Sequence, residues 1–220
     1  KIMLNDKKVC IFIDGENLRH SIGELFPAFN RKEYLPKTDW AKFFDWIACE
    51  ASGPKAERIR AYWYVVGGID YSPFNLNAAR KEHSLEKLLT KNKKFAAVLN
   101  DAPEKDRQKI MEKMADGLQE DQSSMEKRFT GWTYLQDEIA RTNKSIEFRR
   151  AGSIRYDLFE RKFGSEKAVD VKLATDLIKL KDIYDVAVIV SGDQDYVPAV
   201  DAIKDFGKHT VNVSFLTEAG

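Results

Sequence analysis

The sequence predicts an α/β fold built on a mostly parallel sheet, and three observations support this prediction. Short apolar runs, typical of strands buried on both faces, recur along the chain. Segments with helical periodicity lie between these runs. Glycine or proline stands where several of the runs and helices end. Strands that alternate with helices form a parallel sheet with right-handed crossovers.

Five segments are predicted to be strands of this sheet. The first and the fourth are nearly unbroken apolar runs, and the second is rich in aromatic and β-branched residues. The first run stops at Asp14-Gly15 and the fourth at Ser191-Gly192, where glycine permits a tight turn. The five predicted strands are residues 9–13, 57–66, 145–150, 185–190 and 209–215.

Helices are predicted between the strands from their caps. Asn17 is expected to cap a short helix after the first strand, and Thr38 is expected to cap the next one. A helix before the fourth strand is predicted to open at Ser165. Pro198 suits the first turn of a helix before the last strand.

The stretch at about residues 75–143 has a different character. It is rich in Lys, Glu and Gln, and its apolar residues recur at steps of three, four and seven, which predicts helices. We interpret residues 1–220 as a single domain with this stretch as a helical insertion. The insertion is either a solvated structural addition or a functional element, namely a lid or a surface for a protein partner or for self-association, and the spacing does not decide between these.

Composition excludes several classes of protein. Lys and Arg number 36 against 35 Asp and Glu, a formal net charge of +1, so no global basic field exists that would bind nucleic acid. Two cysteines exclude a disulfide scaffold and suit the cytoplasm. No apolar run approaches the roughly 18 residues of a membrane helix, so no membrane partner is expected.

Acidic residues follow two of the predicted strands. Asp14 ends the first strand, and Asp193 and Asp195 follow the fourth. In an open parallel sheet the functional crevice lies beyond the carboxyl ends of the strands. If these two strands are neighbours, the three carboxylates converge. Each acid alone is equally compatible with a turn or a helix cap.

Two further acids lie on the helix before the fourth strand. At 100° per residue Asp170 falls near the apolar face, and Asp176 falls at its other edge as a weaker candidate. Clustered carboxylates repel one another unless a hard cation binds them, so we expect Mg²⁺ or Mn²⁺. The three histidines lie far apart in the sequence, which argues against zinc. Such a site suits phosphoryl chemistry, with a phosphodiester as substrate.

Three motifs carry a resemblance to a known family. They are residues 12–17 (FIDGEN), 167–176 (KAVDVKLATD) and 190–198 (VSGDQDYVP). In these motifs the chain resembles the NYN domains of the PIN-like nuclease superfamily, in particular the LabA-type branch. The resemblance covers about residues 9–66 and 145–216, and the helical insertion has no counterpart in it.

The resemblance implies a PIN-like three-layer sandwich with strand order 3-2-1-4-5, which would place the first and fourth strands side by side. It also implies a metal-dependent ribonuclease. The family's metal-binding acids match Asp14, Asp170, Asp193 and Asp195, its polar helpers match Asn17 and Ser191, and Asp176 matches a less certain position. Relatives often continue into another helix and sometimes into a separate RNA-binding domain. The resemblance therefore allows a further C-terminal domain in the native protein, outside this sequence.

The expected activity is therefore hydrolysis of phosphodiester bonds in RNA by an Mg²⁺- or Mn²⁺-dependent endoribonuclease. Single strands are favoured, because their backbone can bend into an acidic crevice. Basic residues at the rim would offset the repulsion of phosphates by the acids; the candidates are Arg19, Lys167, Arg149, Arg150 and Arg155. Two alternatives remain open: an RNA-binding module without catalysis, and a protein-interaction scaffold that uses the insertion.

Overall fold

The computed structural model describes residues 7–26 and 34–215. The chain divides into two compact units. The first unit consists of Lys1–Gly67, Trp132–Gly152 and Lys167–Gly220, and the second of Gly68–Gly131 and Ser153–Glu166.

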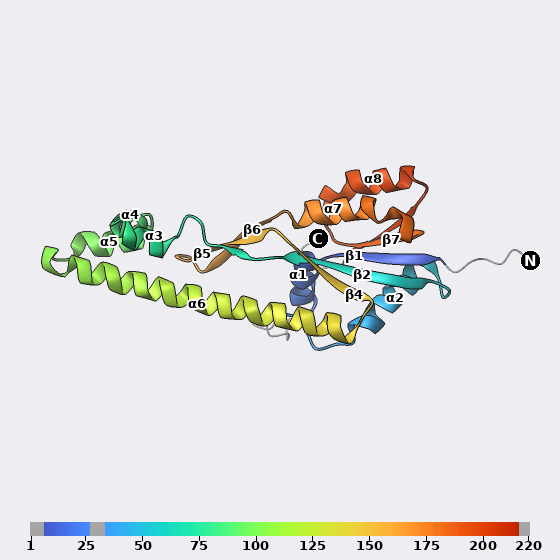
Figure 1. Cartoon of the computed structure of the whole chain (residues 1–220), viewed down its shortest axis with the longest axis horizontal. Coiled ribbons are helices and arrows are strands. Elements are labelled where there is room, and N and C mark those ends of the chain that lie inside the picture. Colours follow the sequence, from blue (N-terminus) through green and yellow to red (C-terminus); the bar gives the residue numbers. More distant parts are fainter. Residues whose placement is uncertain (1–6, 27–33, 216–220) are drawn as a thin grey trace, which may run out of the picture. The chain divides into compact units, whose positions relative to one another are not determined.

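The first unit contains a sheet of five strands in the order β4-β2-β1-β7-β8. Figure 1 labels β4, β2, β1 and β7. Every neighbouring pair in this sheet is parallel. The predicted α/β fold and the order 3-2-1-4-5 are confirmed, because β4, β7 and β8 are the third, fourth and fifth strands of the sheet along the chain. The strands are β1 (Lys8–Asp14), β2 (Glu57–Val66), β4 (Ile146–Ala151), β7 (Val186–Val190) and β8 (His209–Val213).

Alternate residues of β1 point into two separate apolar cores. Ile11 and Ile13 pack with residues of α1 (Gly15–Leu25) and α2 (Trp40–Ser52). Cys10 and Phe12 pack with residues of α7 (Val169–Lys179) and α8 (Val197–Asp205). Since successive strand residues face opposite sides of a sheet, the first unit has three layers, helices–sheet–helices. This explains why the β1 run is apolar throughout.

The predicted caps of the first two helices are wrong. Asp14, and not Asn17, caps α1: its Oδ1 accepts the Asn17 N–H at 3.0 Å. Asp39, and not Thr38, caps α2 by accepting the Lys42 N–H at 3.1 Å. In both places a carboxylate three residues before the free N–H groups takes the cap position.

The helix predicted to open at Ser165 begins instead at Val169, as α7. Ser165 lies in β6 (Lys162–Lys167), a strand in the connection between β4 and α7. It also contains β5 (Ser153–Asp157), whose alternating buried Ile154 and Tyr156 are typical of a strand. Two 3₁₀ turns follow α7 along the chain, Lys181–Ile183 and Gln194–Tyr196.

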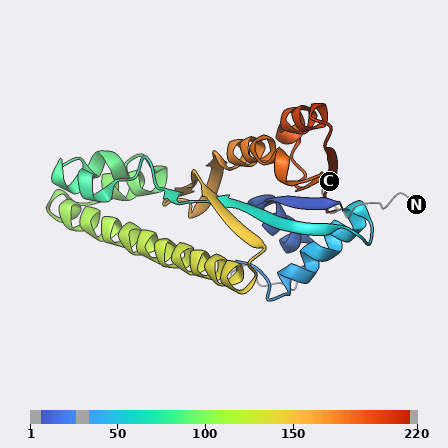
Figure 2. The ribbon, with the colours of Figure 1, turned by 45° about the vertical axis from the view of Figure 1, so that its right-hand side comes forward.

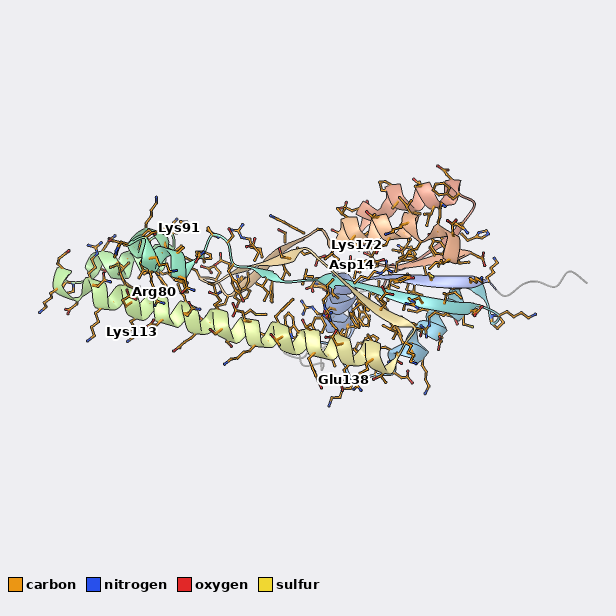
Figure 3. All side chains as sticks on the ribbon, viewed as in Figure 1. Asp14, Arg80, Lys91, Lys113, Glu138 and Lys172 are labelled. Atoms are coloured by element: carbon orange, nitrogen blue, oxygen red, sulfur yellow. The ribbon has the colours of Figure 1, made fainter. Side chains whose placement is uncertain are left out.

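The second unit combines a small sheet with helices. Its sheet has the order β3-β5-β6, with β3 at Ile69–Asp70. Figure 2 shows its helices α3 to α5 in green beside the N-terminal part of the long helix α6. Arg80 joins α3 to α6 by ion pairs to Glu112 and Asp116 (Arg80 is labelled in Figure 3). The helices are α3 (Leu76–Lys81), α4 (Leu85–Leu89), α5 (Lys93–Asp101) and the part of α6 (Glu104–Thr142) up to Gly131; the rest of α6 belongs to the first unit.

No helix within the described ranges is both long enough and apolar enough to cross a membrane.

Candidate active site

The carboxyl ends of β1 and β7 bring two of the predicted acidic segments together. Ile13 of β1 is in register with Val190 of β7, so Asp14 lies beside Ser191 at the same edge. The turn after β1 is tight: a Cβ on Gly15 would lie 2.4 Å from the Tyr64 carbonyl oxygen, which no side chain tolerates. Glycine at this position lets α1 begin directly after Asp14.

Asp14 is almost fully buried, at 4% exposure, and both of its carboxylate oxygens accept hydrogen bonds. Oδ1 accepts the Asn17 N–H, and Oδ2 accepts the Ser191 hydroxyl at 3.2 Å and the Tyr196 hydroxyl at 3.1 Å. Burial raises the pKa of Asp14, and the nearby Asp170 charge acts in the same direction, against the hydrogen bonds from Asn17, Tyr196 and Ser191. The site therefore disfavours the ionised form of Asp14.

Tyr196 connects Asp14 to Asp170. Its hydroxyl lies 2.7 Å from Asp170 Oδ1 and 3.1 Å from Asp14 Oδ2. Burial and the two carboxylates raise the pKa of Tyr196, so the phenol keeps its single proton. One hydroxyl hydrogen cannot serve two carboxylates at once. The pair is thus short of one positive charge or one proton, which is the electrostatic situation that a bound cation relieves.

The backbone before Asp170 is held in an unusual conformation. Ala168, with φ 71°, lies in the left-handed region that non-glycine residues rarely adopt. It separates the end of β6 from the start of α7 and places Asp170 in the first helical turn. A carboxylate there interacts favourably with the helix dipole. The strained residue therefore positions a candidate site residue.

Asp193 and Asp195 lie on the exposed loop after β7. Their chain of hydrogen bonds leads back to Asp14: the Asp193 N–H donates to Ser191 Oγ at 3.0 Å, and the Asp195 N–H donates to Asp193 Oδ1 at 2.9 Å. Asn17 ties the same loop to α1, because its Oδ1 accepts the Gly192 N–H at 3.1 Å. Asp14, Asp170, Asn17 and Ser191 are thus in one network, and the two loop acids join it through their backbones.

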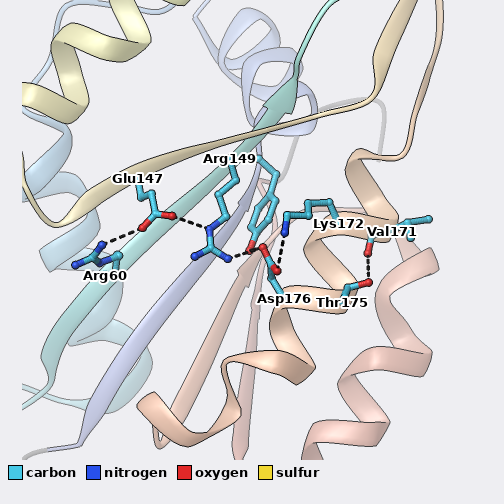
Figure 4. A network of polar contacts seen from close by, with 8 residues as sticks. Arg60, Glu147, Arg149, Val171, Lys172, Thr175 and Asp176 are labelled. Atoms are coloured by element: carbon cyan, nitrogen blue, oxygen red, sulfur yellow. Dashed lines mark hydrogen bonds and ion pairs between the residues drawn. The ribbon is translucent and has the colours of Figure 1, made fainter.

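Asp176 lies in a different environment, shown in Figure 4. It is 1% exposed, and its carboxylate pairs with Arg149 and with Lys172, whose Nζ lies 3.0 Å from Oδ1. The Tyr64 hydroxyl donates to Oδ2 at 3.2 Å. Burial by itself raises the pKa of Asp176, but the bonds from Arg149 and Lys172 outweigh it, and the pKa is lowered. Asp176 is a compensated anion, in contrast to Asp14.

Three of the five basic residues proposed for the rim form ion pairs. Arg19 pairs with Glu16, Arg150 with Asp137, and Arg149 with Asp176 and Glu147. Lys167 is the last residue of β6. Arg155 belongs to the second unit.

Sequence reasoning missed the roles of Tyr196 and Tyr64. Tyr196 directly follows Asp195 in the motif after the fourth strand, and this adjacency was its only signal. Tyr64 is one aromatic residue in a strand rich in them. Both act through hydroxyl contacts to residues far away in the sequence, which no local pattern reveals.

The donor set fits a hard divalent cation. Within residues 7–26 and 34–215, no three His, Cys, Asp or Glu side chains form a group that could hold a metal by themselves. Magnesium, however, is commonly held by one or two carboxylates, with water and substrate phosphate as the other ligands. Asp14 and Asp170, joined through Tyr196, are two such carboxylates, and the missing positive charge is what the ion would supply.

Comparison with known proteins agrees with two of the three motifs, those at residues 167–176 and 190–198. The family model described as "NYN domain" matches residues 97–220, more than half of the chain. The match includes the segments with Asp170 and Asp193 and leaves out β1 with Asp14. A crystal structure of a Vibrio parahaemolyticus protein of unknown function is similar over 97% of this chain and 85% of that chain, with 13% identity and a TM-score of 0.42. No curated protein matches this sequence.

Proposed function

The chain belongs to the NYN domain family, within the PIN-like nucleases, and we propose that it is an Mg²⁺- or Mn²⁺-dependent endoribonuclease that favours single-stranded RNA. The observation that supports this most directly is the pair Asp14 and Asp170, which shares one Tyr196 hydroxyl. We assign the chain to the LabA-type branch on its three motifs, and we interpret residues 1–220 as one domain with an insertion at about 75–143.

Asp14 and Asp170 would hold the cation, and Asp193 and Asp195 would complete its coordination from the loop when RNA binds. The bound ion would supply Lewis-acid activation of a water and would neutralise charge on the phosphate. Ser191 and Asn17 hydrogen-bond Asp14 and the loop, and in this proposal they would also orient an attacking water or a phosphate oxygen. Asp176 would hold its two basic partners, Arg149 and Lys172, in position.

Cleavage of labelled single-stranded RNA tests the proposal. Wild type, Asp193→Asn and the exposed control Asp205→Asn are compared with Mn²⁺, with Mg²⁺ and with EDTA, using single-stranded DNA of the same sequence as a second substrate. We expect metal-dependent cutting of RNA by wild type and by Asp205→Asn, and loss of cutting in Asp193→Asn and in EDTA. Equal binding of RNA by all variants without any cutting would contradict the nuclease and support an RNA-binding module.

A further inference from the structure

Three cations and two carboxylates form a continuous ladder on the α7 side of the sheet. Arg60 donates to Glu147 at 2.9 Å, Glu147 accepts from Arg149 Nε at 2.9 Å, and Arg149 also pairs with Asp176. Asp176 in turn accepts from Lys172 at 3.0 Å. The ladder has one more positive than negative charge. Figure 4 shows it running from β2 and β4 to α7.

This ladder adjoins the candidate active site in the same sheet. Asp14 is in register with Tyr64, and Tyr64 with Arg149, so the three residues lie in one row across β1, β2 and β4. Neighbouring strands are about 4.8 Å apart, so the backbones of Asp14 and Arg149 are separated by about 10 Å. About three stacked nucleotides span such a distance at ~3.4 Å each, and fewer span it in an extended strand.

Lys172 links the two sites along α7. It follows Asp170 by two residues, and its side chain is 42% exposed although its ammonium group contacts Asp176. Figure 3 labels Lys172 and Asp14, which lie at the same end of the sheet. An ammonium group has three N–H donors, so Lys172 has donors left for another acceptor.

Arg149 is fixed in place more firmly than a surface arginine. Its guanidinium lies 4.1 Å from the centre of the Tyr62 ring, its Nε donates to Glu147, and its Nη1 donates to Asp176. A guanidinium has five N–H groups in a rigid plane, and these bonds leave some of them for a further oxygen ligand. Arg149 is thus oriented in advance, which lowers the entropic cost of binding an anion.

We propose that Arg149 and Lys172 bind a phosphate of the RNA that flanks the scissile one, with Asp176 and Glu147 as positioning residues that hold the two cations. The proposal rests on the proposed function, because it assumes that RNA occupies the carboxylate site. RNA must approach four aspartates there, and cations one or a few nucleotides away reduce that repulsion. Asp176 is then a residue that acts through Arg149 and Lys172.

Neutral phosphate analogues test this subsite. A series of short single-stranded RNAs carries one methylphosphonate linkage each, moved one position at a time from the cleavage site. With Mn²⁺ we expect one flanking position where the neutral linkage raises KM about tenfold in wild type and leaves kcat unchanged. In Lys172→Met the same linkage should raise KM less than in wild type, because only Arg149 still contacts that phosphate. In that variant the slope of log affinity against log salt should fall by about 0.7.

Lys179→Met is the matched control. It removes the same charge from the same face of α7, two turns further along the helix. We expect it to keep the wild-type penalty at the flanking position. Arg149→Lys, which keeps the charge and loses the planar fork, should retain part of the penalty and guards against misfolding in a neutral variant.

The outcomes separate the subsite from the nuclease. If Lys172→Met, Arg149→Lys and Lys179→Met all show the wild-type penalty, or if no flanking linkage matters, the subsite is overturned while the nuclease stands. If wild type cuts no RNA, the same oligonucleotides are used in fluorescence anisotropy. A smaller position-dependent penalty in Lys172→Met than in wild type then supports the subsite without the nuclease, and absence of RNA binding overturns both.

Discussion

Asp14, at the end of β1, and Asp176, on α7, are two buried aspartates on the same side of one sheet, yet their surroundings differ in the supply of positive charge. Among the residues that the structure describes, the hydrogen-bond donors to Asp14 are neutral, and one of them, the Tyr196 hydroxyl, is shared with Asp170. Asp176 has an arginine, a lysine and a tyrosine hydroxyl. The pKa of Asp14 is raised and that of Asp176 is lowered. Burial alone thus does not distinguish a binding carboxylate from a structural one; the balance of its partners does.

The largest expected effect is on RNA cleavage. Asp170→Asn and Asp176→Asn make the same change on one helix, but only the first removes a proposed metal ligand. We expect Asp170→Asn to lower kcat by at least about 100-fold, because loss of residues that only support ligands already costs 10–100-fold. Asp176→Asn should mainly raise KM, by about tenfold.

Steady-state kinetics over a range of Mn²⁺ concentrations measure this difference. The comparison breaks down if Asp176→Asn lowers kcat as much as Asp170→Asn does, since both acids would then serve the metal.

Stability without metal should change in opposite directions for the two acids. Asp176→Asn leaves Arg149 and Lys172 facing an amide, and we expect a loss of about 2–3 kcal/mol at pH 7. Asp14→Asn keeps a good helix cap and removes an uncompensated charge, so we expect no loss or a gain of up to about 1 kcal/mol. Urea unfolding in EDTA, with Asp205→Asn as the control, measures both values.

The changes in the free energy of unfolding caused by Asp176→Asn and by Asp14→Asn should depend on pH with opposite signs. The folded-state pKa of Asp176 lies below its ordinary 3.8, so its contribution is present above pH 3.8 and is lost as the pH falls through the folded value. The folded-state pKa of Asp14 lies above 3.8, so its penalty is present above the folded value and disappears below 3.8. Both variants should therefore approach wild-type stability in acid, from opposite sides.

Manganese should stabilise the wild type. A ligand at 100 times its Kd adds about 2.7 kcal/mol to the free energy of unfolding, which for a chain of this length corresponds to about 5–10 °C in Tm. Asp176→Asn should keep this shift and Asp170→Asn should lose it. Differential scanning fluorimetry at millimolar Mn²⁺ is sufficient, and an unchanged wild-type Tm would speak against any metal at this pair.

The smallest expected effect concerns the shared hydroxyl. Tyr196→Phe removes the single donor between Asp14 and Asp170, and we expect a loss of about 1 kcal/mol in EDTA because the two carboxylates lose a buried hydrogen bond. Saturating Mn²⁺ should recover part of that loss, since the cation compensates the same two charges. Equal losses with and without Mn²⁺ would show that the hydroxyl serves packing alone.

The local sequence was sufficient for the sheet and for part of the site. The apolar run at residues 9–13 predicts a strand buried on both faces, and it is one; Asp14 directly after it lies at the carboxyl edge as expected. The predicted strand order is the observed one. The strands follow from side-chain periodicity, which is a property of neighbouring residues, whereas the strand order was implied by the resemblance to the NYN family.

The partners of each acid were decided only by the tertiary structure. Tyr196 reaches Asp14 because β7 pairs with β1, and Arg149 reaches Asp176 because β4 pairs with β2 beneath α7. Whether a buried carboxylate is compensated depends on groups that are distant in sequence and close in space. The sequence by itself determined where the acids are, and packing determined which of them remains short of positive charge.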